Sequence, residues 1–192
     1  STSPFGVFVN TDLLKQAGQP TPAELIAAGR WNWDTVLAVA SAVNAKTGKA
    51  GMVIRDFDYK GWDNLSTFFT GWGAQAWSAD GKTCGFNAPE MVDAMTTLHK
   101  AIFTDKAMPG PGTTADFFAG EAAMTVTQIS RASLLKDDGF AWDLVPLPAG
   151  PKGEYAVVGQ AGIGVLKQSK HVDEALDFLA FMTNPANSAK LA

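Results

Sequence analysis

Cysteine is almost missing from this chain of 192 residues, in which Cys84 is the only one. A single cysteine excludes an intrachain disulfide and a metal cluster held by thiolates. Histidine is scarce too, and neither His99 nor His171 has a second histidine at metal-ligand spacing. We therefore expect both histidines on helix surfaces, and we expect neither a metal nor a cofactor.

The sequence also lacks a strong excess of charge. Its net charge is −4, and its lysines and arginines are scattered, so there is no electrostatic reason to expect nucleic acid or an anionic membrane as a partner. No apolar run approaches the roughly 18 to 20 residues of a membrane span. With 46% hydrophobic and 18% charged residues, the composition indicates an ordered globular core.

The motifs of common enzyme classes are missing as well. There is no Walker-type phosphate loop, no nucleotide fingerprint after a strand, and no Gly-x-Ser-x-Gly elbow. Asp56 and Asp58 flank Phe57 and could supply the acid and base of glycoside hydrolysis. They could equally be solvated loop residues or hydrogen bond to a ligand, and we expect that the protein is not an enzyme.

Short strands alternate with helices along the chain, which indicates an α/β domain. Helix starts are marked by the capping-box spacing Thr21-Pro22-Ala23-Glu24 and by Asn32, and Gly48 marks a helix end. Strands are predicted at 4–10, 50–54, 122–126, 142–146, 156–158 and 162–166. Helices are predicted at 11–18, from 21, at 32–48, 62–69, 87–102, 116–118 and 132–135, and from about 171 to 183. The proline- and glycine-rich stretch 146–153 is the best internal boundary.

Five segments, read in order, resemble one family: the extracellular solute-binding proteins of ABC transporters, of the sugar-binding, maltodextrin-binding-like group. The segments are 9–18, 31–35, 116–124, 143–151, and 164–171 with 181–185. The stretch Asp116-Phe117-Phe118-Ala119-Gly120-Glu121-Ala122-Ala123-Met124 is the most recognisable of them. The resemblance runs nearly the whole length of the chain.

The resemblance implies a periplasmic binding protein-like fold of type II, with two lobes, crossover strands and a ligand cleft between the lobes. It implies that the chain is the second lobe plus a small part of the first lobe. Residues 1–10 would be a crossover strand, 11–146 the second-lobe α/β ligand-binding domain, and 147–192 the return crossover with a strand-helix segment of a truncated first lobe. On this basis the chain alone is expected to bind ligand poorly, because one wall of the cleft would be absent.

A sugar site needs aromatic rings and hydrogen-bonding side chains that converge in a cleft. The loop from Asp56 to Trp62 offers both, and in the family this loop faces the cleft, with Tyr59 where members place a stacking aromatic. The predicted ligand-binding residues of this loop are Asp56, Asp58, Tyr59, Lys60 and Trp62. For Trp62, which begins the next helix, core packing is an equal alternative.

Further candidates follow along the chain. Trp72 lies between two glycines that would allow a sharp turn toward a ligand, with packing in the core as the alternative. Gln128, Ser130 and Arg131 follow a predicted strand, where family members carry a glycine and a cleft tryptophan that this sequence lacks. Gln160 lies where the family's second crossing passes the cleft. Trp33 and Trp77 are predicted core residues.

The resemblance implies the substrate-binding component of an ABC importer, which captures a mono- or oligosaccharide and delivers it to a membrane permease. It also implies a monomeric, periplasmic or extracellular lipoprotein whose N-terminal membrane anchor lies outside this sequence. Arg131 and Lys60 keep open a phosphorylated polyol, a peptide or another polar solute as ligand. Glycoside hydrolysis by Asp56 and Asp58 is the third alternative.

Overall fold

The computed structural model describes residues 2–54, 62–110, 112–113, 115–136 and 139–189, without the side chain of Trp62. The chain divides into two compact units. One comprises residues 3–159, and the other comprises residues 1–2 with 160–192. In the part of the chain that is described, no helix is both long and apolar enough to cross a membrane.

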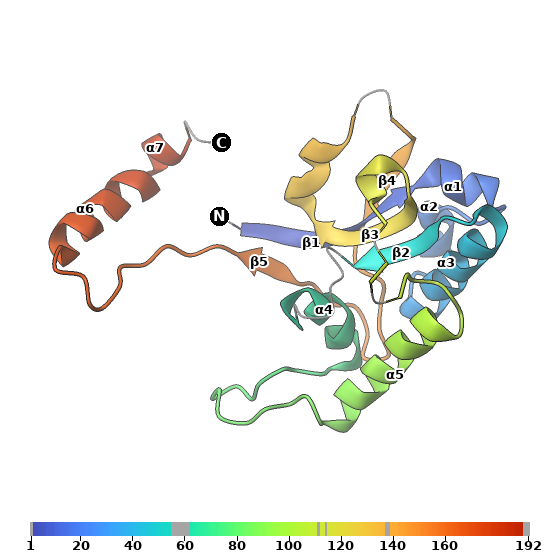
Figure 1. Cartoon of the computed structure of the whole chain (residues 1–192), viewed down its shortest axis with the longest axis horizontal. Helices are drawn as coiled ribbons and strands as arrows, with labels where there is room; N and C mark the ends of the chain where they lie inside the picture. Colours follow the sequence, from blue (N-terminus) through green and yellow to red (C-terminus); the bar gives the residue numbers. More distant parts are fainter. Residues whose placement is uncertain (1, 55–61, 111, 114, 137–138, 190–192) are drawn as a thin grey trace. The chain divides into compact units, whose positions relative to one another are not determined.

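A five-stranded mixed sheet forms the centre of the larger unit (Figure 1). The strand order is β2-β3-β1-β4, with β5 also paired to β1. β2 and β3 are parallel, whereas β1 is antiparallel to both β3 and β4. The strands are β1 (Thr2–Asn10), β2 (Ala50–Ile54), β3 (Ala122–Gln128), β4 (Trp142–Val145) and β5 (Val158–Gln160).

Helices connect and cover these strands, which confirms the predicted α/β class. The α-helices are α1 (Thr11–Gln16), α2 (Pro22–Ala27), α3 (Trp33–Thr47), α4 (Trp62–Phe69), α5 (Pro89–Phe103), α6 (Val172–Thr183) and α7 (Pro185–Ser188). The described residues also form the 3-10 helices η1 (Thr70–Trp72), η2 (Phe117–Ala119) and η3 (Ile129–Leu134).

The helix ends follow the predicted capping chemistry. The Thr21 side chain accepts from the backbone N–H of Glu24, whose carboxylate accepts from the N–H of Thr21, which completes a capping box. The Asn32 side chain accepts from the N–H of Thr35, 3.0 Å away, and starts α3. Gly48 ends α3 in the left-handed region at φ 71°.

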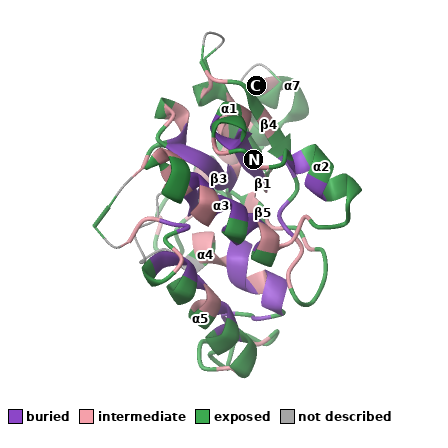
Figure 2. Ribbon diagram, turned by 90° about the vertical axis from the view of Figure 1, so that its right-hand side faces the viewer, coloured by how far each residue is buried: buried purple, intermediate pink, exposed green. Residues whose placement is uncertain are grey.

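The core lies on both faces of the sheet. β3 is buried over nearly its whole length (Figure 2). Val7 and Val9 of β1 face a large apolar cluster that includes residues of α3 and α5, while Phe8 faces a smaller cluster with Phe117. This alternation is what a strand buried on both faces requires.

The segment after β4 is bound into the larger unit rather than separating from it. Ala149 accepts from the N–H of Trp33 and donates to the carbonyl of Trp31, each at 3.0 Å. At Gly150 an added Cβ would lie 2.1 Å from the carbonyl oxygen of Gly71, so the two backbones are in direct contact. The compact unit therefore extends to Gly159, beyond the boundary predicted after Pro146, and the assignment of lobes to residue ranges stays a prediction.

A hydrogen-bonded tyrosine completes this attachment. The indole Nε1–H of Trp33 donates to the Tyr155 hydroxyl at 2.8 Å, and that hydroxyl donates to the carbonyl of Thr67. Burial raises the pKa of Tyr155 above its ordinary value, although the hydrogen bond from Trp33 opposes this shift. The hydroxyl therefore stays protonated and able to donate. α3, α4 and the segment after β4 share this one oxygen atom.

Two sequence predictions differ from the structure. The sequence predicts a strand at residues 162–166, but β5 is the last strand among the described residues, and 162–166 have no strand assignment. Apart from Val165 these residues are exposed, and no described strand pairs with them, so apolar sequence alone does not make a strand there. The segments predicted as short helices near 116–118 and 132–135 are the 3-10 helices η2 and η3.

Replacing Tyr155 by phenylalanine tests the central hydrogen bond. The Trp33 indole N–H would lose its acceptor inside the core, so we expect Tyr155→Phe to lower the free energy of unfolding by about 1–3 kcal/mol. Urea denaturation followed by circular dichroism measures this change. Thr96→Val, which removes a hydroxyl bonded to the Val92 carbonyl on an exposed helix face, should change it by less than about 0.5 kcal/mol. Equal losses in the two variants would contradict the assigned role.

Candidate functional site

The sheet topology brings distant parts of the chain to one edge. Because β2 and β3 are parallel, with Ile54 opposite Val126, their carboxyl ends lie at the same edge. β1 is antiparallel to β3, with Phe5 opposite Gln128, so the amino end of β1 lies there too. We call this the carboxyl edge. In open α/β sheets, ligands bind outside the carboxyl ends of the strands.

Polar side chains from β1 and η3 meet at the carboxyl edge. The Ser3 hydroxyl donates to the Ser130 hydroxyl at 3.1 Å and accepts from the backbone N–H of Ser130 at 3.3 Å. Gln128 lies beside Gly159 of β5, where an added Cβ would be 3.2 Å from the Gln128 side-chain nitrogen. Gly159 therefore leaves room for that side chain, which carries both a donor and an acceptor.

The side chain of Arg131 is held in place by an aromatic ring. Its guanidinium carbon lies 5.4 Å from the ring centroid of Phe118, at a distance where cation–π attraction operates. The Phe118 ring in turn packs edge-on against Phe8, with 6.1 Å between centroids. Because Phe8 is fully buried, the aromatic cluster gives Arg131 a fixed support.

Much of the predicted loop lies outside the described residues. This applies to Asp56, Asp58, Tyr59 and Lys60, and the side chain of Trp62 is likewise outside the description although its backbone begins α4. Ile54, the last residue of β2, places the start of this loop at the carboxyl edge. Gln160 ends β5 and belongs to the smaller compact unit. The ligand-binding roles of all six residues stay predictions.

Two tryptophans differ in burial. Trp72 is only 8% exposed and stacks on Phe68, with ring centroids 4.4 Å apart. Phe68 in turn contacts the buried ring of Trp33. This burial supports the packing interpretation of Trp72, and contact with a ligand stays a prediction. Trp33 is a core residue as predicted, but the prediction for Trp77 is wrong, because Trp77 is 49% exposed.

The sequence alone did not reveal every residue at this site. Ser3 is 127 residues away from Ser130, and only the antiparallel pairing of β1 with β3 brings them together. Phe118 lies in one of the segments that carry the family resemblance, but nothing in the sequence indicates that its ring supports Arg131. Such contacts depend on the register of the sheet, which no local pattern reports.

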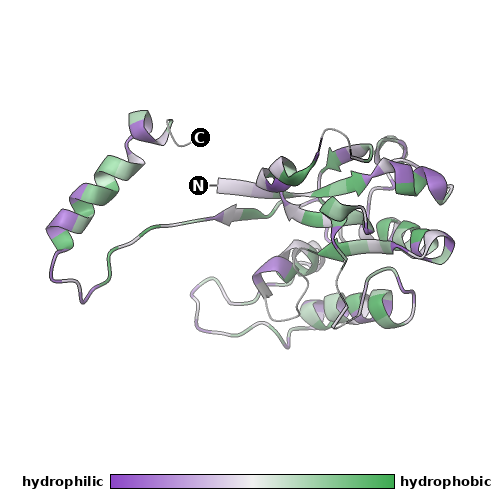
Figure 3. Cartoon of the chain, turned by 45° about the horizontal axis from the view of Figure 1, so that its top comes forward, coloured by the Kyte–Doolittle hydropathy of each residue, from purple (hydrophilic) through white to green (hydrophobic). Residues whose placement is uncertain are grey.

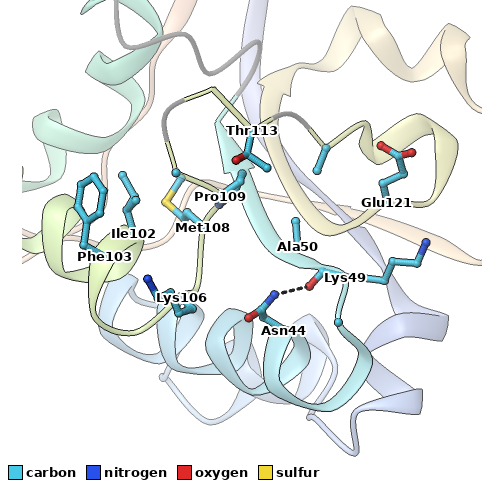
Figure 4. Close-up of a pocket in the computed structure, with 13 residues that line it drawn as sticks. Asn44, Lys49, Ala50, Ile102, Phe103, Lys106, Met108, Pro109, Thr113 and Glu121 are labelled. Atoms are coloured by element: carbon cyan, nitrogen blue, oxygen red, sulfur yellow. Dashed lines mark hydrogen bonds between the residues drawn. The ribbon is translucent and has the colours of Figure 1, made fainter.

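A hollow of about 640 Å³ lies at the opposite edge of the sheet, near the amino ends of β2 and β3 (Figure 4). Lys49, Lys106 and Glu121 bring charges of both signs to it, beside the apolar Phe103 and Met108. The Glu121 carboxylate already accepts from the backbone N–H of Asp116 at 2.9 Å. Across the described ranges, no three His, Cys, Asp or Glu side chains are grouped to hold a metal ion.

A family model described as bacterial extracellular solute-binding protein matches residues 1–189. The chain belongs to this family. The resemblance inferred from the sequence is thereby confirmed. No curated protein sequence matches the chain.

Solved structures of solute-binding proteins share the fold. The ABC substrate-binding protein from Listeria monocytogenes in complex with cycloalternan is 27% identical with a TM-score of 0.78, covering 99% of this chain and 48% of that one. A maltose-bound protein of T. maritima is 24% identical with a TM-score of 0.72, covering 97% and 49%. UgpB from Mycobacterium tuberculosis in complex with glycerophosphocholine is 22% identical with a TM-score of 0.74, covering 99% and 49%.

The chain therefore spans about half the length of the solved structures it matches. The likeness establishes the α/β fold of periplasmic binding proteins for this chain. The two structures below 25% identity bear on the fold alone.

The packing role of Trp72 can be tested by Trp72→Leu. Loss of a buried ring that stacks on Phe68 should lower the free energy of unfolding by about 2–4 kcal/mol, measured by denaturant titration. Trp142→Leu is the matched control, because Trp142 is well exposed on β4, and its loss should be clearly smaller. A variant of Trp72 that keeps its stability but loses ligand affinity would instead assign the ring to the binding site.

Proposed function

We propose that this protein is the substrate-binding component of an ABC importer and that it captures a mono- or oligosaccharide at the carboxyl edge. Family membership over residues 1–189 is the observation that carries the proposal. The Listeria monocytogenes protein in complex with cycloalternan, at 27% identity, supports a saccharide ligand. Proteins of this family bind solutes, and we propose that this one releases its ligand unchanged rather than converting it.

The chemistry of the carboxyl edge suits hydroxyl groups. Gln128 offers a donor and an acceptor, Ser3 and Ser130 offer hydroxyls, and Arg131 offers paired donors in a fixed plane. The loop after Ile54 would add the ring of Tyr59 and the predicted polar side chains, together with Trp62. Stacking of sugar C–H faces on rings combined with hydrogen bonds to the rim gives affinity and orientation at once.

We further propose that the ligand is enclosed between two lobes and handed to a membrane permease on the periplasmic or outer face of the cell. A lipid anchor at the N-terminus and a monomeric state belong to the same proposal. Residues 147–192 would form the return crossing and part of the first lobe. In support of this, Leu176, Phe178 and Phe181 of α6 are large apolar residues that are exposed and need a covering surface. Hydrophobic residues recur along the ribbon of this helix (Figure 3).

Isothermal titration of the full-length protein against a panel of sugars tests the proposal. We expect one class of saccharide to bind, and Gln128→Ala to weaken it about tenfold, since a lost hydrogen bond of about 1.4 kcal/mol corresponds to that factor. Gln16→Ala, on the exposed face of α1, should leave the affinity unchanged. If no sugar binds, and amino acids or metal ions bind instead, the carbohydrate proposal is overturned.

One observation favours a second ligand class. The guanidinium of Arg131, held over Phe118, suits an anionic group as well as a pair of hydroxyls. A phosphorylated polyol, a peptide or another polar solute would then be the ligand in the same fold. Affinity that requires the ligand's phosphate and falls with Arg131→Gln would favour this alternative. Glycoside hydrolysis by Asp56 and Asp58 has no supporting observation beyond their spacing, and Asn replacements with unchanged turnover would dismiss it.

A further inference from the structure

Residues 75–85, between η1 and α5, form a tight hairpin that we call the Trp77 hairpin. Trp77 and Cys84 are bridge partners across it. The backbone N–H of Gly85 donates to the carbonyl of Ala76 at 2.8 Å, and that of Ser78 donates to the carbonyl of Thr83 at 2.9 Å. In two views the hairpin projects from the body on the side of the sheet where β1 begins (Figures 1 and 3). That side is the carboxyl edge.

The hairpin is ordered by its own hydrogen bonds. The Ser78 hydroxyl donates to the Asp80 carboxylate at 2.6 Å, and the backbone N–H of Lys82 donates to the same oxygen at 3.1 Å. The hydrogen bond from the Ser78 hydroxyl, and to a smaller extent that from Lys82, holds the pKa of Asp80 below its ordinary value. At Gly85 a Cβ would lie 2.1 Å from the Gln75 carbonyl oxygen, so the two sides of the hairpin can approach this closely only where one residue is glycine. These contacts therefore hold the backbone that carries Trp77 in one conformation.

The Trp77 ring faces solvent to an extent that core packing does not explain. It is 49% exposed, whereas Trp33, which does pack in the core, is 1% exposed. Trp77 lines a hollow of about 400 Å³ together with Ser66, Thr70 and Gln75. This volume lies within the range of about 300–1,000 Å³ that is usual for small-ligand pockets.

The polar groups of this hollow are available to a ligand. Within the described ranges, neither the Thr70 hydroxyl nor the Gln75 amide is engaged in a hydrogen bond, and the same holds for the Trp77 indole N–H. A half-exposed ring beside uncommitted donors and acceptors is what a pyranose needs, because its C–H face stacks while its hydroxyls bond. A charged ligand has less reason to bind, because no charged side chain lines the hollow among the residues described.

We propose that the Trp77 hairpin is a second saccharide subsite, which stacks one ring of an oligosaccharide on Trp77 and bonds its hydroxyls through Thr70 and Gln75. The inference rests on the proposed function and narrows it, because a ligand that occupies both places is an oligosaccharide rather than a monosaccharide. The carboxyl edge holds one end of the ligand, and the Trp77 hairpin holds a ring farther along.

Affinity as a function of chain length tests the subsite. The full-length protein is titrated with maltose through maltopentaose and with cellobiose through cellopentaose, by calorimetry. In the series that binds, we expect the longer saccharides to bind about tenfold more tightly than the disaccharide, and Trp77→Ala to remove this advantage. Trp77→Phe should retain part of it. Trp142→Ala, which removes another exposed tryptophan, should retain all of it.

Cys84 provides a direct reporter of occupancy. It is the only cysteine, it is exposed, and it lies opposite Trp77, so an environment-sensitive maleimide dye attached there reports on the subsite. We expect the dye to respond to the longer saccharides and not to the disaccharide. Unchanged thermal midpoints and circular dichroism of the variants show that the fold is intact.

The outcomes separate the two proposals. Saccharides could bind with an affinity that Gln128→Ala lowers, while Trp77→Ala has the affinity of the wild type for every chain length. In that case the subsite alone is overturned and the proposed function stands. If no saccharide binds the full-length protein, the proposed function fails and the subsite fails with it.

Discussion

The hydroxyl of Tyr155 is the atom on which the arrangement of the site depends. It receives a hydrogen bond from Trp33 in α3 and gives one to Thr67 in α4, inside the core. α4 follows the loop that is predicted to face the ligand and precedes the Trp77 hairpin. The segment that carries Tyr155 leads directly into β5, where Gly159 lies beside Gln128. One hydroxyl thus joins α3, α4 and the segment after β4, and the last of these leads to β5 beside Gln128.

The position of β1 in the sheet determines which distant residues the beginning of the chain contacts. It lies between β3 and β4 and is antiparallel to both, so the beginning of the chain lies beside residues more than a hundred positions later. Such long-range pairing costs chain entropy when the protein folds, and the fully buried Val7, Phe8 and Val9 offset that cost. The polar contacts of Ser3 with Ser130 therefore follow from burying hydrophobic side chains that begin four residues further along the same strand.

Sequence reasoning succeeded where the physical cause is local. The caps at Thr21, Asn32 and Gly48 and the buried strands need only neighbouring residues, and the ordered family resemblance supplied the fold. It failed where the cause is tertiary. An exposed Trp77 and a buried Trp72 have similar small-residue surroundings in the sequence, and only the packing of Phe68 against Trp72 separates them. The apolar residues 162–166 likewise lack a described partner strand, which no periodicity reveals.

The contact between Gly71 and Gly150 has a consequence for how this sequence can drift over evolutionary time. A side chain at Gly150 would collide with the carbonyl of Gly71, and one at Gly71 would meet the Tyr155 ring at 2.9 Å. Neither position accepts a replacement unless backbone on the other side shifts. At Gly81, at the tip of the Trp77 hairpin, the same addition meets nothing within 4 Å, and only its left-handed φ favours glycine. A replacement at the joint between Gly71 and Gly150 therefore requires neighbouring atoms to move, whereas one at Gly81 meets only the strain of a left-handed backbone.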